Sequence, residues 1–128
     1  PKAGDEFTIT LSEAHLDWGT HRYTDTRDMI NGEAYLPIPR EVAISLNIYN
    51  SNSAQNNIYS CKSTDGFLNG EELKAAGSSK KGDHYAKQFQ GNGNLKLLGA
   101  WYNKISAKPG DQIKVSWLTQ TDIVLAKV

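Results

Sequence analysis

The side chains best suited to catalysis in this chain form one short triplet. Glu72-Leu73-Lys74 has the acid-x-Lys form found in nuclease centres, and Asp65 lies upstream of it. Such short patterns often arise by chance, and this one lies on a stretch rich in turn residues. We therefore expect no catalysis by this chain alone, although a small magnesium-dependent nuclease built on these three side chains remains an alternative.

Metal and cofactor chemistry is not expected either. His15, His21 and His84 lie far apart, and no cysteine or carboxylate cluster joins them at a metal-ligand spacing. The single cysteine, Cys61, excludes an internal disulfide framework and fits a reducing compartment, so we expect a cytoplasmic protein. No apolar run approaches the length of a membrane span, and the polar start of the chain does not resemble a signal peptide.

Charge is distributed unevenly along a chain whose formal net charge is +0. Residues 1–72 hold five lysines and arginines against eleven acidic residues. Residues 73–108 hold seven lysines against a single acidic residue, Asp83. A basic segment of this kind favours an anionic partner. The alternative is a folded surface on which the two signs are interspersed.

The chain length favours one domain over residues 1–128. Alternating or continuous apolar patterns predict short strands over 7–12, 34–38, 57–63, 84–89, 112–118 and 122–128. A further short apolar run covers 95–98. A helix is expected from Pro39, with Arg40 on the surface of its first turn, and a second over 99–105. About seven short strands and two short helices fit a mainly β, partly closed antiparallel barrel.

Apolar side chains in the last two expected strands point to the core. Ile113, Val115 and Trp117 share one face by alternation, and Ile123 with Leu125 repeats the pattern. Trp101 is expected in the core from the amphipathic helix pattern. Residues 15–33, by contrast, are polar and without periodicity. Connections of this length are often functional.

Two stretches of the chain carry a family resemblance. HLDWGTHRYTDTRD and EAYLPIPREVA fall in 15–43, and GNLKLLGAWYNKISAKPGDQIKVSW covers 93–117; the resemblance is carried by Trp18-Gly19, Arg22, Ala34–Pro39 and Leu98–Trp101. In order and spacing they resemble the DNA-binding pseudobarrel of plant B-three transcription factors. They resemble more closely the C-terminal DNA-recognition domain of phospholipase-D-type type II restriction endonucleases. The resemblance covers about residues 7–127. The chain departs from the family in its charge, because DNA-binding domains are usually basic and this chain is neutral.

The resemblance implies a seven-stranded open pseudobarrel with two short helices that binds double-stranded DNA. It also implies a nuclease domain fused to or associated with this one, with no membrane partner and no cofactor of its own. Two arms would grip the major groove. The N-arm corresponds to roughly 17–31 and the C-arm to roughly 78–96, inside the basic segment.

The residue types in both arms suit contacts to DNA. Lysine and serine suit phosphates, whereas arginine, asparagine, glutamine and aspartate suit base edges. Arg22 and Arg27 are expected to read bases or clamp the backbone, with Asp25 reading cytosine or orienting an arginine. The N-arm candidates are His21, Arg22, Tyr23, Thr24, Asp25, Thr26 and Arg27. The C-arm candidates are Ser79, Lys80, Lys81, Lys87, Gln88, Gln90, Asn92, Asn94 and Lys96.

A second hypothesis is a small β-barrel that binds a carbohydrate or a peptide. Loops rich in asparagine, glutamine and glycine would form its site with tyrosines expected to be exposed, namely Tyr49, Tyr59, Tyr85 and Tyr102. Salt separates the two hypotheses, because binding to DNA weakens steeply as counterions are regained.

Overall fold

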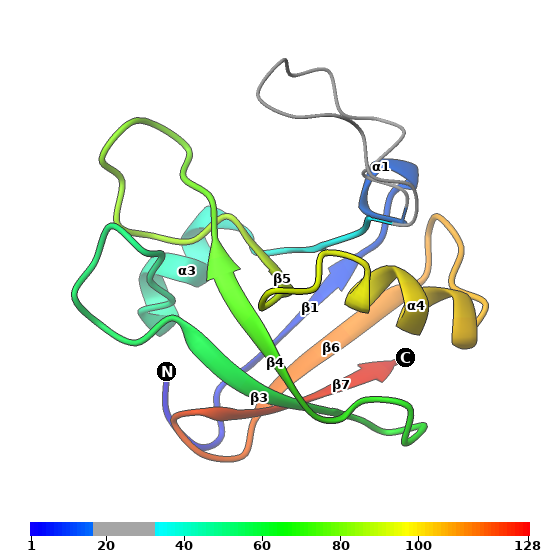
Figure 1. The fold of residues 1–128 in the computed structure, drawn as a ribbon. Helices are drawn as coiled ribbons and strands as arrows, with labels where there is room; N and C mark the ends of the chain where they lie inside the picture. The colour runs from blue at the N-terminus through cyan, green and yellow to red at the C-terminus, as the bar shows by residue number, and fades with distance from the viewer. Residues whose placement is uncertain (17–32) are drawn as a thin grey trace.

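A computed structural model of the chain describes residues 1–16 and 33–128. Seven strands and three short helices are found in these ranges (Figure 1). The strands are β1 (Glu6–Thr10), β2 (Leu36–Pro37), β3 (Ile58–Ser63), β4 (Asn69–Ala76), β5 (Gln88–Gly91), β6 (Gln112–Trp117) and β7 (Asp122–Lys127). The helices are α1 (Glu13–Leu16), α3 (Arg40–Leu46) and α4 (Leu97–Lys104).

The seven strands form one sheet that curls into a nearly closed barrel. Their order is β1-β6-β7-β3-β4-β5-β2, so that β1 and β2 are the two edges and leave an unsealed seam. β3 and β7 pair in parallel, and the other strand pairs of the described chain are antiparallel. The predicted mainly β, seven-stranded open pseudobarrel is therefore confirmed. The expected helices correspond to α3 and α4, and α1 is an additional single turn.

The barrel interior is filled by the inward side chains of alternating strands. Ile113, Val115 and Trp117 of β6 are buried, as are Ile123 and Leu125 of β7, which confirms the predicted core face. Trp101 of α4 is also buried, as expected. The register of β6 with β7 places Val115 opposite Leu125 and Trp117 opposite Ile123, so the two apolar rows meet directly.

Helix α3 follows the expected pattern from its first residue. Pro39 is the N-cap, and its carbonyl accepts hydrogen bonds from Val42 N and Ala43 N, both at 3.0 Å. The helix ends at Asn47, whose φ of 58° and ψ of 49° are left-handed. Asparagine is one of the few residues other than glycine that adopts this conformation readily.

β4 was not predicted from the sequence. Glu72-Leu73-Lys74 was expected in a turn-rich stretch, but these residues lie in the strand between β3 and β5. Only Leu73 and Ala75 in β4 are buried, so the apolar alternation is too short to stand out in the sequence. The wrong assignment arose because the strand has only these two buried positions to mark it.

The expected strand over 84–89 is wrong in its bounds. β5 covers Gln88–Gly91, and Tyr85 makes only an isolated bridge to Tyr49. After β5 the chain turns and enters α4 at Leu97, two residues before the expected helix. A close approach explains the turn: a Cβ on Gly91 would lie 2.0 Å from the carbonyl oxygen of Asn94, so only glycine fits there.

Candidate nucleic-acid interface

The N-arm candidates lie outside the described residues. These are His21, Arg22, Tyr23, Thr24, Asp25, Thr26 and Arg27, all within 17–32. The described chain on either side of that segment is held together at the barrel seam. Tyr35 N donates a hydrogen bond of 3.2 Å to His15 O, and the two rings meet edge to face at 5.1 Å. Residues 15 and 35 are therefore held side by side.

The candidates Ser79, Lys80 and Lys81 lie on the segment 77–87, which we call the β4–β5 connection. All three residues are exposed. Asp83 N donates to Lys80 O at 3.1 Å and Gly82 has a φ of 80°, so a tight turn presents both lysines to solvent. Figure 1 shows this connection and α1 both toward the top of the view.

Asp83 is the one acidic residue of the basic segment, and it is turned inward. Its side chain is 4% exposed and accepts a hydrogen bond from Arg40 Nη1, with a second, at 3.3 Å, from Tyr85 N. The hydrogen bond from Arg40 lowers the pKa of the Asp83 carboxyl from its usual value. The Asp83 carboxylate is thus paired with Arg40 of α3. This pairing leaves Lys80 and Lys81 without an acidic partner within the β4–β5 connection.

Asn50 anchors the same connection from beneath. It is buried, and its Nδ2 lies within hydrogen-bond distance of three carbonyl oxygens: Asp83 at 2.7 Å, Gly77 at 2.9 Å and Tyr85 at 3.3 Å. Asn52 Nδ2 donates to Asp83 O as well, at 2.9 Å. This role could not be predicted from the sequence, because Asn50 opens the polar run NSNSAQNN, which is typical of a solvated loop. Nothing in that run marks one asparagine as buried.

Three further candidates lie at or on β5. Lys87 is exposed just before the strand, and Gln88 and Gln90 alternate with the buried Phe89. Gln88 Nε2 donates to Gln90 Oε1 at 3.1 Å, so the two amides form a pair on the outer face. β5 therefore divides the expected C-arm, roughly 78–96, into a part before the strand and a part after it.

The last three candidates lie in the turn after β5. Asn92 Nδ2 donates to Glu72 Oε1 at 3.2 Å, and Asn94 Oδ1 accepts from Lys96 N at 3.2 Å. Both amides already have partners in the chain, so they shape the turn before α4. Lys96 is exposed at the N-cap position of α4. Because β5 separates this turn from the β4–β5 connection, the two groups of candidates lie at opposite ends of one strand.

Two of the three side chains named for the nuclease alternative are hydrogen-bonded within the described chain. Asp65 accepts a hydrogen bond of 2.9 Å from Trp101 Nε1, and Glu72 accepts one from Asn92. Within residues 1–16 and 33–128, no group of three or more His, Cys, Asp or Glu side chains could hold a metal ion. In the same ranges, no helix is both long and apolar enough to cross a membrane.

The tyrosines of the carbohydrate hypothesis are not all exposed. Tyr59 and Tyr102 are only 1% and 3% exposed, so the expectation for these two is wrong. They are drawn into the core because their rings pack against other aromatic side chains. Tyr49 and Tyr85 are half-buried and stack on each other at 5.6 Å.

Comparison with known proteins gives no independent assignment. No protein-family model matches the chain, and no curated protein sequence matches it.

Proposed function

We propose that this domain recognises a specific sequence in double-stranded DNA and serves as the target-recognition domain of a restriction endonuclease. The N-arm and the β4–β5 connection would enter the major groove. The outer face of β5 and the turn before α4 would extend the contact. In this proposal the chain has no catalytic centre of its own, and cleavage belongs to a nuclease domain fused to it or associated with it.

The burial of Asp83 is the observation that carries the proposal. A basic loop that only needed to be soluble could keep its aspartate at the surface beside its lysines. Here the carboxylate is paired with Arg40 of α3, and the exposed side of the turn is left with two lysines. Such uncompensated, exposed cations attract phosphates. The family resemblance then favours duplex DNA among anionic partners.

Two pairs of lysines give a matched test. Lys80→Ala/Lys81→Ala removes two charges from the β4–β5 connection, and Lys104→Ala/Lys108→Ala removes two exposed charges from the end of α4 and beyond. Binding to random-sequence duplexes is measured by fluorescence anisotropy at several salt concentrations. We expect the first variant to reduce the slope of log K against log salt by about 2, and the second to leave it near the wild-type value. Equal effects of the two variants would refute an interface at the connection.

Sequence specificity needs a separate readout. Selection of bound sequences from random duplexes should return one enriched site. Arg22→Ala is expected to relax the preference at one base position, whereas Lys81→Ala should weaken all sequences alike. An unenriched pool would contradict specific recognition, even if salt-dependent binding were found.

A further inference from the structure

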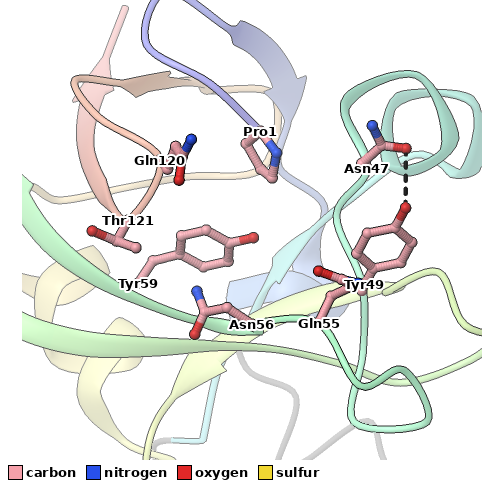
Figure 2. A pocket seen from close by; sticks show the side chains of 8 residues that line it. All are labelled: Pro1, Asn47, Tyr49, Gln55, Asn56, Tyr59, Gln120 and Thr121. Atoms are coloured by element: carbon pink, nitrogen blue, oxygen red, sulfur yellow. Dashed lines mark hydrogen bonds between the residues drawn. The ribbon is translucent and has the colours of Figure 1, made fainter.

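A polar pocket lies where β3 begins, beside the turn between β6 and β7. Its volume is about 440 Å³, and eight residues line it (Figure 2). Asn47 and Tyr49 come from the end of α3 and the chain after it, Gln55 from the loop before β3, and Gln120 with Thr121 from the β6–β7 turn. None of the eight described residues that line the pocket has a charged side chain. The site is therefore unlike the lysine-rich β4–β5 connection.

Tyr59 of β3 forms part of the pocket wall, and its hydroxyl group is buried without a hydrogen-bond partner among the described residues. The residue is 1% exposed. Its ring is fixed edge to face against Phe89 at 5.8 Å and Trp117 at 6.0 Å. Figure 2 shows the hydroxyl directed into the space between Pro1, Tyr49 and Asn56. A phenylalanine would fill the core equally well, so packing does not explain the hydroxyl.

Tyr102 gives the contrasting case in the same molecule. It is also buried, but its hydroxyl donates a hydrogen bond of 2.9 Å to Tyr35 O. A buried hydroxyl without such a partner destabilises the fold, because it has lost its water and gained nothing in return. Burial raises the pKa of Tyr59 to about 12, so the group is a protonated donor at any ordinary pH.

Other polar groups of the pocket are free to bind as well. The side chains of Gln55 and Gln120 are exposed and have no hydrogen bond recorded with the described residues. Asn47 Oδ1 accepts from Tyr49 Oη at 3.2 Å, which orients the Tyr49 ring and leaves the Asn47 amide nitrogen available. Planar amides offer a donor and an acceptor side by side, and the flat ring offers an apolar face.

We infer that this pocket binds a neutral, hydroxyl-rich ligand of monosaccharide size, with the Tyr59 hydroxyl as its buried hydrogen-bonding partner. Amides, hydroxyls and one aromatic ring satisfy the hydroxyls and apolar faces of a sugar ring. No lining side chain is charged, and the amino group of Pro1 is the one charged group among the described residues that line the site. The volume lies within the usual range for small-molecule sites. None of its lining residues is a proposed DNA contact, so either proposal can fail without the other.

The test uses D-glucose, D-galactose and N-acetyl-D-glucosamine as probes, with D-galacturonate as the charged counterpart of galactose. The side-chain amide signals of Asn47, Gln55 and Gln120 are followed by ¹H–¹⁵N NMR at probe concentrations up to about 100 mM, which saturate even a millimolar site. We expect a saturable shift of these signals with at least one neutral sugar, and galacturonate should bind no more tightly than galactose does. No saturable shift with any neutral sugar, or tighter binding of galacturonate than of galactose, overturns the proposal.

Two conservative variants separate a ligand role from a structural one. Tyr59→Phe is expected to raise the Tm, because it removes an unpaired buried hydroxyl, and to weaken sugar binding about fivefold, the ratio for one neutral hydrogen bond. Tyr102→Phe should lower the Tm and leave sugar binding unchanged. If Tyr59→Phe binds the sugar as well as the wild-type protein does, Tyr59 is not its partner and the inference fails.

Discussion

The β4–β5 connection and the Tyr59 pocket are both built on buried polar side chains, but they differ in how those side chains are satisfied. At the connection, Asp83 is paired with Arg40 and Asn50 binds three carbonyl groups. At the pocket, Tyr59 Oη has no partner. Figure 1 shows the connection at the top of the view and the β6–β7 turn, beside the pocket, at the bottom.

The difference separates scaffolding from recognition. Polar groups that are fully satisfied inside the chain hold a backbone segment in place, and exposed side chains on that segment then meet the partner. A polar group that is buried and unsatisfied does the opposite, because it is a vacant hydrogen-bonding position within the fold. The exposed lysines of the connection therefore predict an anionic ligand. The uncharged polar side chains of the pocket predict a neutral, hydroxyl-rich one.

Salt gives the largest expected contrast between the regions. If Lys80, Lys81, Lys87 and Lys96 each neutralise one phosphate, DNA affinity should fall about a hundredfold between roughly 50 and 200 mM salt. Sugar binding at the pocket should not change over the same range, since no ion pair is involved. Anisotropy for DNA and NMR titration for the sugar test this on one protein sample. A parallel loss of both affinities would contradict the division of chemistry.

Removal of the Asn50 amide should cause the next largest effect. Asn50→Ala leaves the carbonyls of Gly77 and Tyr85 without their side-chain donor and removes one of the two donors to Asp83 O. This loss should cost about 2 kcal/mol of unfolding free energy, or about thirtyfold in the folding equilibrium. The control is Asn52→Ala, because Asn52 is exposed and its side-chain amide donates to one carbonyl of the connection, that of Asp83. It should cost less than about 1 kcal/mol. Urea unfolding measures both, and similar losses would show that the buried amide is not the anchor.

Acid should weaken the connection through Asp83. Its pKa is lowered, chiefly by the hydrogen bond from Arg40, so its stabilising contribution is complete above the ordinary value of 3.8. That contribution is lost as the pH falls through the lower pKa of the folded state. Asp83→Asn cannot titrate, so its urea midpoint should change less between pH 5 and pH 2 than that of the wild-type protein. Glu41→Gln, a surface change on α3, should keep the wild-type profile.

The smallest expected effect concerns His15 at the barrel seam. Partial burial lowers the pKa of His15 from 6.5, and its Nδ1 accepts a hydrogen bond of 2.9 Å from Ser12 N, which requires the neutral ring. Its contribution to stability is present above pH 6.5 and declines as the pH falls toward its folded-state pKa. His15→Asn keeps an acceptor but does not titrate. The variant should therefore show a flatter dependence of Tm between pH 7 and pH 5, and an unchanged slope would count against this role.

Several elements of the fold could be predicted because local patterns and tertiary packing agree. β6 alternates apolar and polar residues over six positions, and β7 contains a continuous apolar run from residue 123 to residue 126. α3 is capped by a proline at its start and by an asparagine at its end. β4 could not be predicted, because its inner face contributes only Leu73 and Ala75 to the core. β4 is held in the sheet by its backbone pairing with β3 and β5, and this pairing leaves no apolar pattern in the sequence of β4 itself.

The candidate site was predictable in part for the same reason. The basic character of residues 73–108 is a property of composition, so the lysines of the β4–β5 connection could be selected from the chain alone. Nothing in composition indicates that Asp83 points inward, or that Arg40, more than forty positions earlier, lies beside it. The pocket could not be predicted from the sequence either, because its lining residues come from the end of α3, from β3 and from the β6–β7 turn, which are distant in the chain.

The sequence by itself determined the barrel class, the core of its last strands and the location of positive charge, because these depend on residue type and short-range periodicity. The tertiary structure alone decided which polar groups are satisfied. Burial of Asp83, Asn50 and Tyr59 depends on segments that are distant in the chain and meet only after folding. Hydrogen bonding between such groups is a property of distance and angle in space, and no local pattern specifies it.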